Sequence, residues 1–235
     1  MSQLSEHIIN ELQSLGNYEK AKNLSRFFKT GPGEYGENDI FIGVTLPEQR
    51  KIVAQYHKEI SFSDISDLLD SVYHEARLTG VLLLIKKGTN KEQQSDAVDL
   101  YLKKKHTINN WDLVDCSAPY LTGEYFFNHD RTTLFQLVQS ESIWDIRIAV
   151  MTTFYFIRKL DFADTLKMAD ILLHHKHDLI QKAVGWMLRE IGNRDMNVET
   201  DFLKTRYTKM PRTMLRYAIE KFPEDLRKAY LNGNI

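Results

Sequence analysis

The chain has 235 residues, 43% of them hydrophobic, which is enough apolar material for one large core or two small ones. Its 31 basic and 32 acidic residues nearly balance, so any binding to nucleic acid must come from local charge asymmetry. The longest apolar run, near Val81 to Ile85, is too short to span a bilayer, and the polar amino-terminal stretch predicts no cleavable signal.

Helical periodicity dominates the chain, and turn signals recur at short intervals. We expect helices over residues 2–15, 17–28, 47–59, 63–71, 74–87 and 91–106, one starting at Trp111, and others over 131–139, 142–159, 162–174, 178–194, 198–207, 211–221 and 224–231. No central strand pattern is present, so the predicted fold class is all-α.

One segment breaks the helical pattern. Residues 31–44, GPGEYGENDIFIGV, hold four of the eleven glycines together with a proline. Aromatic and β-branched residues follow these glycines. The composition predicts a loop or a small hairpin inserted between helices.

Several of the expected helices repeat one pattern, in which a cation precedes a run of small and aliphatic residues. The cations are Arg77, Arg147 and Lys182, spaced by multiples of 35 residues. Position 112 lies one period after Arg77, and Arg216 follows Lys182 by 34, so the period covers five units. A helix pair per unit of this length is typical of an α-solenoid, which we predict as a single domain over residues 1–235.

The repeated cations have two interpretations. They could be solvated basic residues at helix starts, which are common, or they could line one face of the solenoid as a basic groove for a polyanion. Residues 202–219 add to the local asymmetry, since they contain five basic residues and no acidic one.

The helix from Trp111 places an indole and a carboxylate, Asp115, four residues apart and therefore on one face. Trp111 could be a core anchor with Asp115 in an intrahelical ion pair, or the two could grip a planar or cationic group. Trp186, four residues after Lys182, should also lie near the groove, whereas Trp144 at a helix start is the candidate structural tryptophan. Cys116, the single cysteine, suits a reducing cytoplasm, and its acidic neighbour disfavours a reactive thiol.

A carboxylate within a basic groove would weaken the binding of nucleic acid. Its presence there makes sense if a positive charge must be stabilised during a reaction. Breakage of a glycosidic bond creates such a charge, because the sugar becomes an oxocarbenium ion. Indole rings would add cation–π attraction to a positively charged base, about 1 kcal/mol each at exposed sites. No phosphate-binding loop, zinc-protease motif or serine elbow is present, and the tract at His174, His175 and His177 resembles a metal site only loosely.

Three segments carry a resemblance to a known family: INNWDLVD at residues 108–115, IWDIRIAV at 143–150 and IQKAVGWMLRE at 180–190. Together they resemble the bacterial DNA alkylation-repair family, the AlkD-type DNA glycosylases built from HEAT-like repeats. The likeness runs from the helix at residue 47 to the last helices. It implies a HEAT-like α-solenoid that excises cationic N3- and N7-alkylpurines from double-stranded DNA without a metal or other cofactor.

The resemblance also implies roles for individual residues. The family's catalytic aspartate falls on Asp115, its groove tryptophans on Trp111 and Trp186, and its phosphate-contacting arginine on Arg147. Phe27 is the best match for a tyrosine on the family's second helix, so the ring is kept and the hydroxyl is lost. Residues 31–44 have no counterpart that we can align.

The leading hypothesis is therefore a monomeric, cytoplasmic DNA repair glycosylase that releases 3-methyladenine and 7-methylguanine. Asp115 would act on the sugar cation, and Trp111, Trp186, Phe27, Arg147, Lys182, Arg77 and Arg216 would contact DNA. One alternative is a non-catalytic member that binds damaged, branched or distorted DNA. Another is a helical scaffold for proteins.

Overall fold

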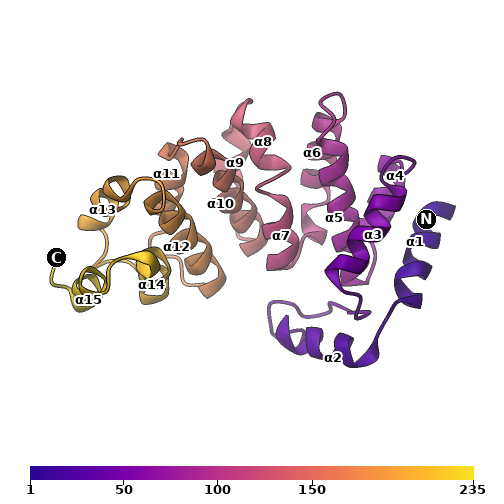
Figure 1. The fold of residues 1–235 in the computed structure, drawn as a ribbon, viewed down its shortest axis with the longest axis horizontal. Helices are drawn as coiled ribbons and strands as arrows, with labels where there is room; N and C mark the ends of the chain where they lie inside the picture. Colours follow the sequence, from indigo (N-terminus) through magenta and orange to yellow (C-terminus); the bar gives the residue numbers. More distant parts are fainter. The chain divides into compact units, whose positions relative to one another are not determined.

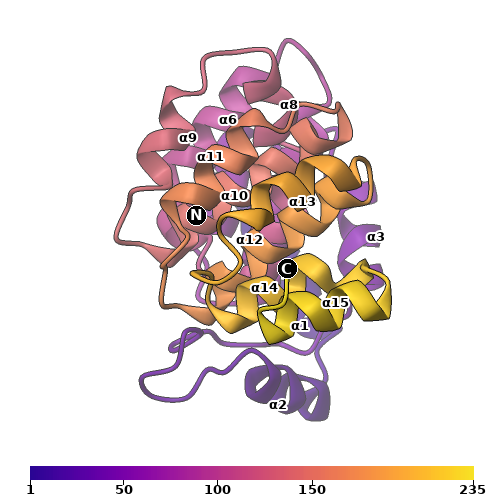
Figure 2. The same ribbon diagram turned by 90° about the vertical axis from the view of Figure 1, so that its left-hand side faces the viewer.

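A computed structural model describes all residues from 1 to 235 as fifteen α-helices and two short 3-10 helices (Figures 1 and 2). The only β-type pairing is an isolated parallel bridge between Ile40 and Tyr73. The predicted all-α class is confirmed. The chain folds as two compact units, residues 1–117 and 118–235, and each is described by itself.

The first unit is built around a helix that is buried along most of its length. Its elements are α1 (Gln3–Ser14), α2 (Tyr18–Phe27), α3 (Leu46–Tyr56), α4 (Phe62–Leu69), α5 (His74–Gly88), α6 (Gln94–Lys103), η1 (Lys105–Thr107) and α7 (Trp111–Ser117). Helix α5 packs against α3, α4, α6 and α7. Side-chain caps at Ser2, Asn17 and Ser61 fix the starts of α1, α2 and α4.

Helix α2 differs from its neighbours. It has no buried residue and lies across the end of the row formed by α3, α5 and α6 (Figure 1). It is attached at both ends: Phe28 is buried just after its carboxyl end, and the backbone N–H of its cap residue Asn17 donates to the carbonyl oxygen of Ile42 at 3.0 Å.

The glycine-rich segment is a loop of turns, so the hairpin considered from the sequence is wrong. A hairpin needs its backbone amides for a partner strand. Here the amides of Ile42, Gly43 and Val44 donate to the carboxylate of Glu75 on α5, at 2.9, 2.7 and 3.3 Å. The buried carboxylate thus replaces the missing strand and ties the loop to α5.

The second unit has two long, central helices. Its elements are α8 (Thr122–Phe127), α9 (Thr132–Leu137), α10 (Ile143–Arg158), α11 (Ala163–Ile171), α12 (Asp178–Gly192), α13 (Met196–Lys204), α14 (Arg212–Ala218), η2 (Ile219–Lys221) and α15 (Glu224–Asn232). Helix α10 packs against α8, α9, α11 and α12, and α12 packs against α11, α13 and α14. None of the fifteen α-helices combines the length and the apolar composition that a transmembrane segment requires.

The period of about 35 residues is visible in the order of the helices. The related positions 77, 112, 147 and 182 fall in the first two turns of α5, α7, α10 and α12, whereas 216 lies in the last turn of α14. The repeat therefore places four of the five positions at similar points of their helices. Their side chains do not share one environment, as described below.

Candidate functional site

Trp111 begins α7 and lies in a cluster of aromatic rings from its own unit. Its ring stacks on Phe28 with centroids 5.1 Å apart, and Phe27 meets it edge-on at 5.9 Å. Its indole N–H donates to the hydroxyl of Tyr35 in the glycine-rich loop, at 3.3 Å. The structure thus brings together Trp111 and Phe27, two residues singled out from the sequence.

Asp115 lies one turn after Trp111 on α7 and is half-buried. Its charge acts on two groups beside it, the phenol of Tyr101 and the thiol of Cys116. Phe27, in contrast, is 63% exposed at the end of α2. The face of α7 that carries Trp111 and Asp115 is therefore partly accessible, and an apolar exposed ring borders it.

A buried polar network, which the sequence does not predict, connects the loop to α5 and α7. His74 bridges two carboxylates, with Nδ1 at 2.9 Å from Asp39 and Nε2 at 2.8 Å from Asp112. Asp39 also accepts hydrogen bonds from the side-chain amides of Asn109 and Asn110. An acidic residue within a glycine-rich loop is usually solvent-exposed, so the sequence held no sign of this burial.

Electrostatics fix the charge state of this network. Burial alone would lower the pKa of His74, but its hydrogen bonds to Asp112 and Asp39 and their charges raise that pKa to about 9. Burial would raise the pKa of Asp39, yet the hydrogen bond from His74 and the charges of Arg77 and His74 hold it below its ordinary value. His74 is therefore an imidazolium at neutral pH.

Arg77 belongs to the same network. It is only 5% exposed, forms an ion pair with Asp39 and donates to the carbonyl of Ser71 at 2.9 Å. The repeat pattern predicts that Arg77 lies in an exposed basic stripe, and this prediction is wrong because the side chain is inside the protein. A guanidinium held by a buried carboxylate is not available to a phosphate in this conformation.

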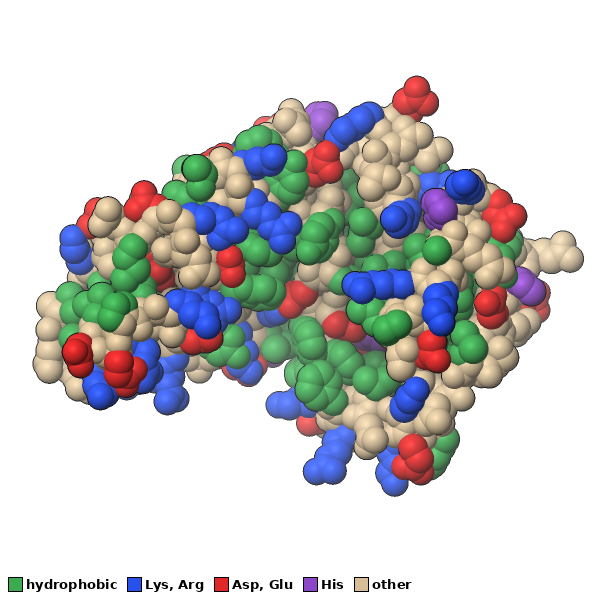
Figure 3. Space-filling model, viewed as in Figure 1, with side chains coloured by type: hydrophobic (Ala, Val, Ile, Leu, Met, Phe, Trp, Pro, Cys, Tyr) green, Lys and Arg blue, Asp and Glu red, His purple; other side chains and the backbone are tan.

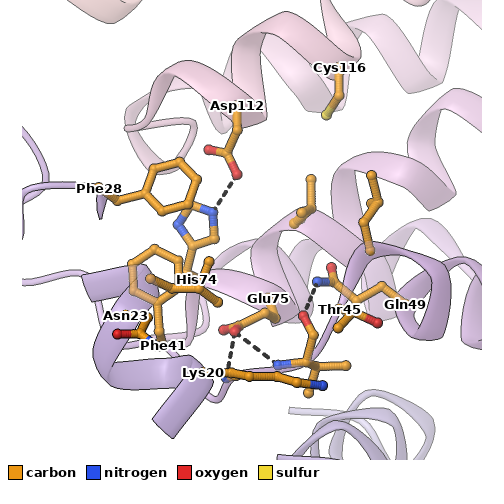
Figure 4. Close-up of a pocket in the computed structure, with 15 residues that line it drawn as sticks. Lys20, Asn23, Phe28, Phe41, Thr45, Gln49, His74, Glu75, Asp112 and Cys116 are labelled. Atoms are coloured by element: carbon orange, nitrogen blue, oxygen red, sulfur yellow. Dashed lines mark hydrogen bonds and ion pairs between the residues drawn. The ribbon is translucent and has the colours of Figure 1, made fainter. Parts of the chain in front are cut away.

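A pocket of about 480 Å³ lies between α2, the end of the loop, α3, α5 and α7 (Figure 4). Asp112 and Cys116 of α7 line one side, and Glu75, Thr45 and Gln49 line the opposite side. Phe28 and Phe41 form a stacked aromatic wall, with ring centroids 5.1 Å apart. The pocket therefore combines apolar walls with a few polar groups, as small-molecule sites do.

Cys116 behaves as the sequence suggests. Burial, with the charges of Asp112 and Asp115, raises the pKa of its thiol far above the ordinary value. Its Sγ lies 3.5 Å from the carbonyl oxygen of Leu113. A thiol that stays protonated is a poor nucleophile.

Trp186 of the second unit lies among rings and cations. Its indole N–H donates to Glu190 at 3.2 Å, and its ring lies 6.0 Å from that of Phe154. The guanidinium groups of Arg158 and Arg194 lie 4.3 and 5.9 Å from the Phe154 ring centroid. Figure 3 shows Lys and Arg side chains gathered over α10 and α12. This face of the second unit therefore pairs aromatic rings with cationic side chains.

The remaining repeat cations are placed differently from one another. Arg147 is 5% exposed, and its Nη1 donates to the carbonyl oxygen of Leu179 at 2.6 Å. Lys182 has a side chain 37% exposed and pairs with Asp178 at 2.8 Å, while Arg216 is exposed. Only Lys182 and Arg216 are thus at the surface, and Arg147 fixes the amino-terminal end of α12.

The histidine tract is a helix start. His177 caps α12 by accepting a hydrogen bond from the backbone N–H of Leu179 at 3.2 Å. Burial, with the nearby charge of His177, lowers the pKa of His175. No group of three or more His, Cys, Asp or Glu side chains is placed to hold a metal ion.

The fold and the sequence together define an all-helical repeat protein with a partly exposed tryptophan and aspartate on one helix. The sequence profile of the DNA alkylation repair enzyme family matches residues 8–222, and the chain belongs to this family. No curated protein matches it. Among solved structures, it is similar to one described as a predicted DNA alkylation repair enzyme from Enterococcus faecalis, with 18% identity and a TM-score of 0.69. That match covers 89% of this chain and 97% of the other.

The family match confirms the resemblance seen in the three sequence segments. It supports a role in DNA repair and implies DNA as the substrate. The structural match, at its low identity, shows a shared fold.

Proposed function

We propose that the protein is a DNA glycosylase that hydrolyses the N-glycosidic bond of cationic alkylated purines in duplex DNA. Family membership over residues 8–222 carries the proposal, because the residues that the resemblance marks as functional lie within this range. The bond to a cationic purine is already weakened by the positive charge of the base. Catalysis then requires mainly a group that stabilises the sugar cation as it forms.

Asp115 is the residue proposed for this task. A half-buried carboxylate interacts with a nearby cation more strongly than a solvated one, because less water screens it. Asp115 would stabilise the oxocarbenium ion or orient the attacking water. Trp111, one turn before it, and Phe27 beside Trp111 would supply the apolar contacts to the deoxyribose.

The second unit would supply phosphate contacts. Lys182 and Arg216 are at the surface, and Trp186 lies beside Phe154 of α10, whose ring also contacts the guanidinium groups of Arg158 and Arg194. Arg147 has a different role in this proposal. It would position Lys182, since it holds the first turn of α12 through Leu179.

A release assay tests the proposal. The protein is incubated with methylated duplex DNA, and free 3-methyladenine and 7-methylguanine are quantified. We expect release by the parent protein and its loss, by roughly a hundredfold or more, in Asp115→Asn. Asp96→Asn, the same change at an exposed site on α6, is the matched control and should release base at the parent rate.

A non-catalytic DNA-binding role is the second candidate, and one observation favours it. The indole of Trp111 is already engaged by Phe28, Phe27 and Tyr35, so its ring has less surface left for a sugar. Tight, salt-sensitive binding to damaged or branched DNA without release of base would establish this role. No binding to DNA at low salt would point instead to a protein scaffold.

A further inference from the structure

One buried carboxylate of the glycine-rich loop accepts from four donors on other parts of the first unit. Asp39 is 6% exposed, and its two oxygens divide these donors between them. Its Oδ1 accepts from Arg77 and from the side-chain amide of Asn109 at 3.2 Å. Its Oδ2 accepts from His74 at 2.9 Å and from the side-chain amide of Asn110 at 3.1 Å. Asp39 therefore joins α5 to the two residues that precede α7.

These contacts fix the backbone on both sides of Trp111. Asn110 is fully buried, and its Oδ1 also accepts from the backbone N–H of Trp111 at 2.8 Å. On the other side, Asp112 accepts from Nε2 of His74 at 2.8 Å. The same imidazole donates to Asp39 through Nδ1, so Trp111 is held from residue 110 and from residue 112.

Helix α7 needs this support because it has only seven residues. A helix of this length is not stable without tertiary contacts. Its carboxyl end is anchored by Ser117, whose hydroxyl bonds to that of Tyr101 at 2.7 Å. Its amino-terminal end is held by the network around Asp39 and by the rings that pack on Trp111. Asp115 lies one turn after Trp111, so a displacement of the first turn would also move its carboxylate.

Stability alone does not account for a buried ionic network at this place. The attraction between buried charges barely offsets their desolvation, and apolar residues of similar volume often stabilise a protein as well or better. Hydrogen bonds are directional, whereas apolar contacts are not. A network of hydrogen bonds is therefore better suited than apolar packing to fixing the position of a helix that carries reacting groups.

We propose that Asp39 is a positioning residue for the reaction, which holds the first turn of α7 and thereby places Trp111 and Asp115 against the deoxyribose. The inference rests on the proposed function, since Asp115 is the group proposed to act on the sugar cation. Asp39 itself is buried and is not placed to touch DNA. Its effect on the rate therefore passes through Asp115.

Release of 7-methylguanine in a single turnover, with protein in excess, gives the rate constant that tests this proposal. Asp39→Asn keeps the size of the side chain but removes its charge and replaces one acceptor by a donor. We expect the rate constant to fall by roughly ten- to a hundredfold, because a small misplacement of a reacting group has a cost of this order. The Kd for DNA should change by less than about twofold, since the phosphate contacts remain.

A double-mutant cycle distinguishes positioning from a loss of folded protein. In the Asp115→Asn background, Asp39→Asn should have almost no further effect, since the group that it positions has already been disabled. A loss of folded protein would lower the rate constants in both backgrounds by the same factor and would overturn the proposal. Leu12→Ala, at a fully buried position of α1 outside the network, is the matched control. It should release base at the parent rate at a temperature where melting curves show that it is folded.

Hydrogen exchange followed by mass spectrometry tests the structural part of the proposal without any activity. Asp39→Asn should speed the exchange of backbone amides in residues 109–117 by roughly tenfold or more, and those of α4 should change less. Unchanged exchange in residues 109–117 would overturn the proposal. A parent protein that releases no base would contradict the proposed function alone, because the exchange rates still decide whether Asp39 holds α7.

Discussion

At the residue scale, His74 determines how the first unit depends on pH. It is 1% exposed and lies between two carboxylates, so its proton is held by two hydrogen bonds and two opposite charges. Loss of that proton would leave Asp39 and Asp112 near each other without the cation between them. Buried charges that lose a partner are strongly destabilising.

We therefore expect stability to fall when His74 titrates. Its pKa is about 9 in the folded protein against an ordinary 6.5, so its contribution is complete below pH 6.5 and is lost as the pH rises through 9. The free energy of unfolding should decrease across this window by up to about 1.4 kcal/mol per pH unit from this group. Urea unfolding of the parent and of His74→Gln at several pH values measures this decrease. The variant should be less stable at neutral pH, and its unfolding free energy should change less with pH. If the two curves of unfolding free energy against pH were parallel, His74 would not have this role.

Glu199 in the second unit should contribute a separate pH dependence. Burial raises its pKa from 4.5 to about 9, despite the opposing charge of Arg189, and its Oε1 has no hydrogen-bond partner. The folded state thus favours the neutral acid, so its contribution is present below pH 4.5 and is lost as the pH rises through 9. Glu199→Gln, which is neutral throughout, should raise the melting temperature by an amount that grows across this range. A constant difference would show that Glu199 does not titrate as proposed.

At the scale of elements, the glycine-rich loop is a structural part of the first unit. Its backbone amides bind Glu75, its Asp39 binds His74 and Arg77, and its Tyr35 accepts from Trp111. The loop therefore connects α5 to α7, the helix that carries Asp115. Its correct conformation should matter for the candidate site as well as for folding.

Gly43→Ala tests this connection. Gly43 has φ +89°, and a Cβ there would clash with the backbone carbonyl oxygen of Asn17. We expect a loss of roughly 2–4 kcal/mol in unfolding free energy, since strain and overlap add. Gly33→Ala is the matched control, because Gly33 has φ +76° but nothing within 4 Å of the added atom. Its loss should be about 1 kcal/mol, so equal losses would mean that conformation alone, and not the clash, decides the effect.

The helices were predictable from the sequence because their apolar spacing and caps are local properties. The expected ranges agree with α1 to α7 and α9 to α15 within a few residues, and α8 was missed. Gly123 in its first turn reads as a helix breaker. It is needed because a Cβ there would lie 2.6 Å from that of Tyr155, so α8 packs closely on α10. Close packing of one helix on another produces no periodic pattern in the sequence, so the sequence did not predict α8.

The candidate site was predictable only in part, for the same reason. Trp111, Asp115 and Phe27 come from local spacing and the family resemblance, and the structure brings Trp111 and Phe27 together. The network around His74 depends on contacts between residues 35 to 71 positions apart. The repeat located Arg77 and Arg147 on the right helices but could not show that both are buried.

For the whole molecule, charge limits how DNA can be bound. The net charge is −1, so affinity for a polyanion must come from surface cations gathered on one face. Lys182 and Arg216 are at the surface, whereas Arg77 and Arg147 are not. That the two units form one continuous solenoid over residues 1–235 stays a prediction.

The salt dependence of DNA binding should distinguish the surface cations from the buried ones. Removal of one cation that neutralises a phosphate reduces the slope of log K against log salt concentration by about 0.9. We expect this reduction for Lys182→Ala and for Arg216→Ala, with little change in melting temperature, because both side chains are at the surface. Fluorescence anisotropy at several salt concentrations gives the slopes. Lys58→Ala, at an exposed cation outside the repeat positions, should leave the slope unchanged.

Arg147→Ala should mainly lower the stability of the protein and should leave the salt dependence of DNA binding nearly unchanged. It removes the donor to Leu179 and leaves a cavity beside α12, so we expect the free energy of unfolding to fall by roughly 2–4 kcal/mol. Binding would weaken because Lys182 is no longer held in place, while phosphate contacts by other cations remain. Arg147→Lys keeps the charge but not the guanidinium geometry, and should restore little of the stability. If Arg147→Ala instead lowered the salt slope at unchanged melting temperature, the side chain would be leaving its buried position to meet phosphate when DNA binds.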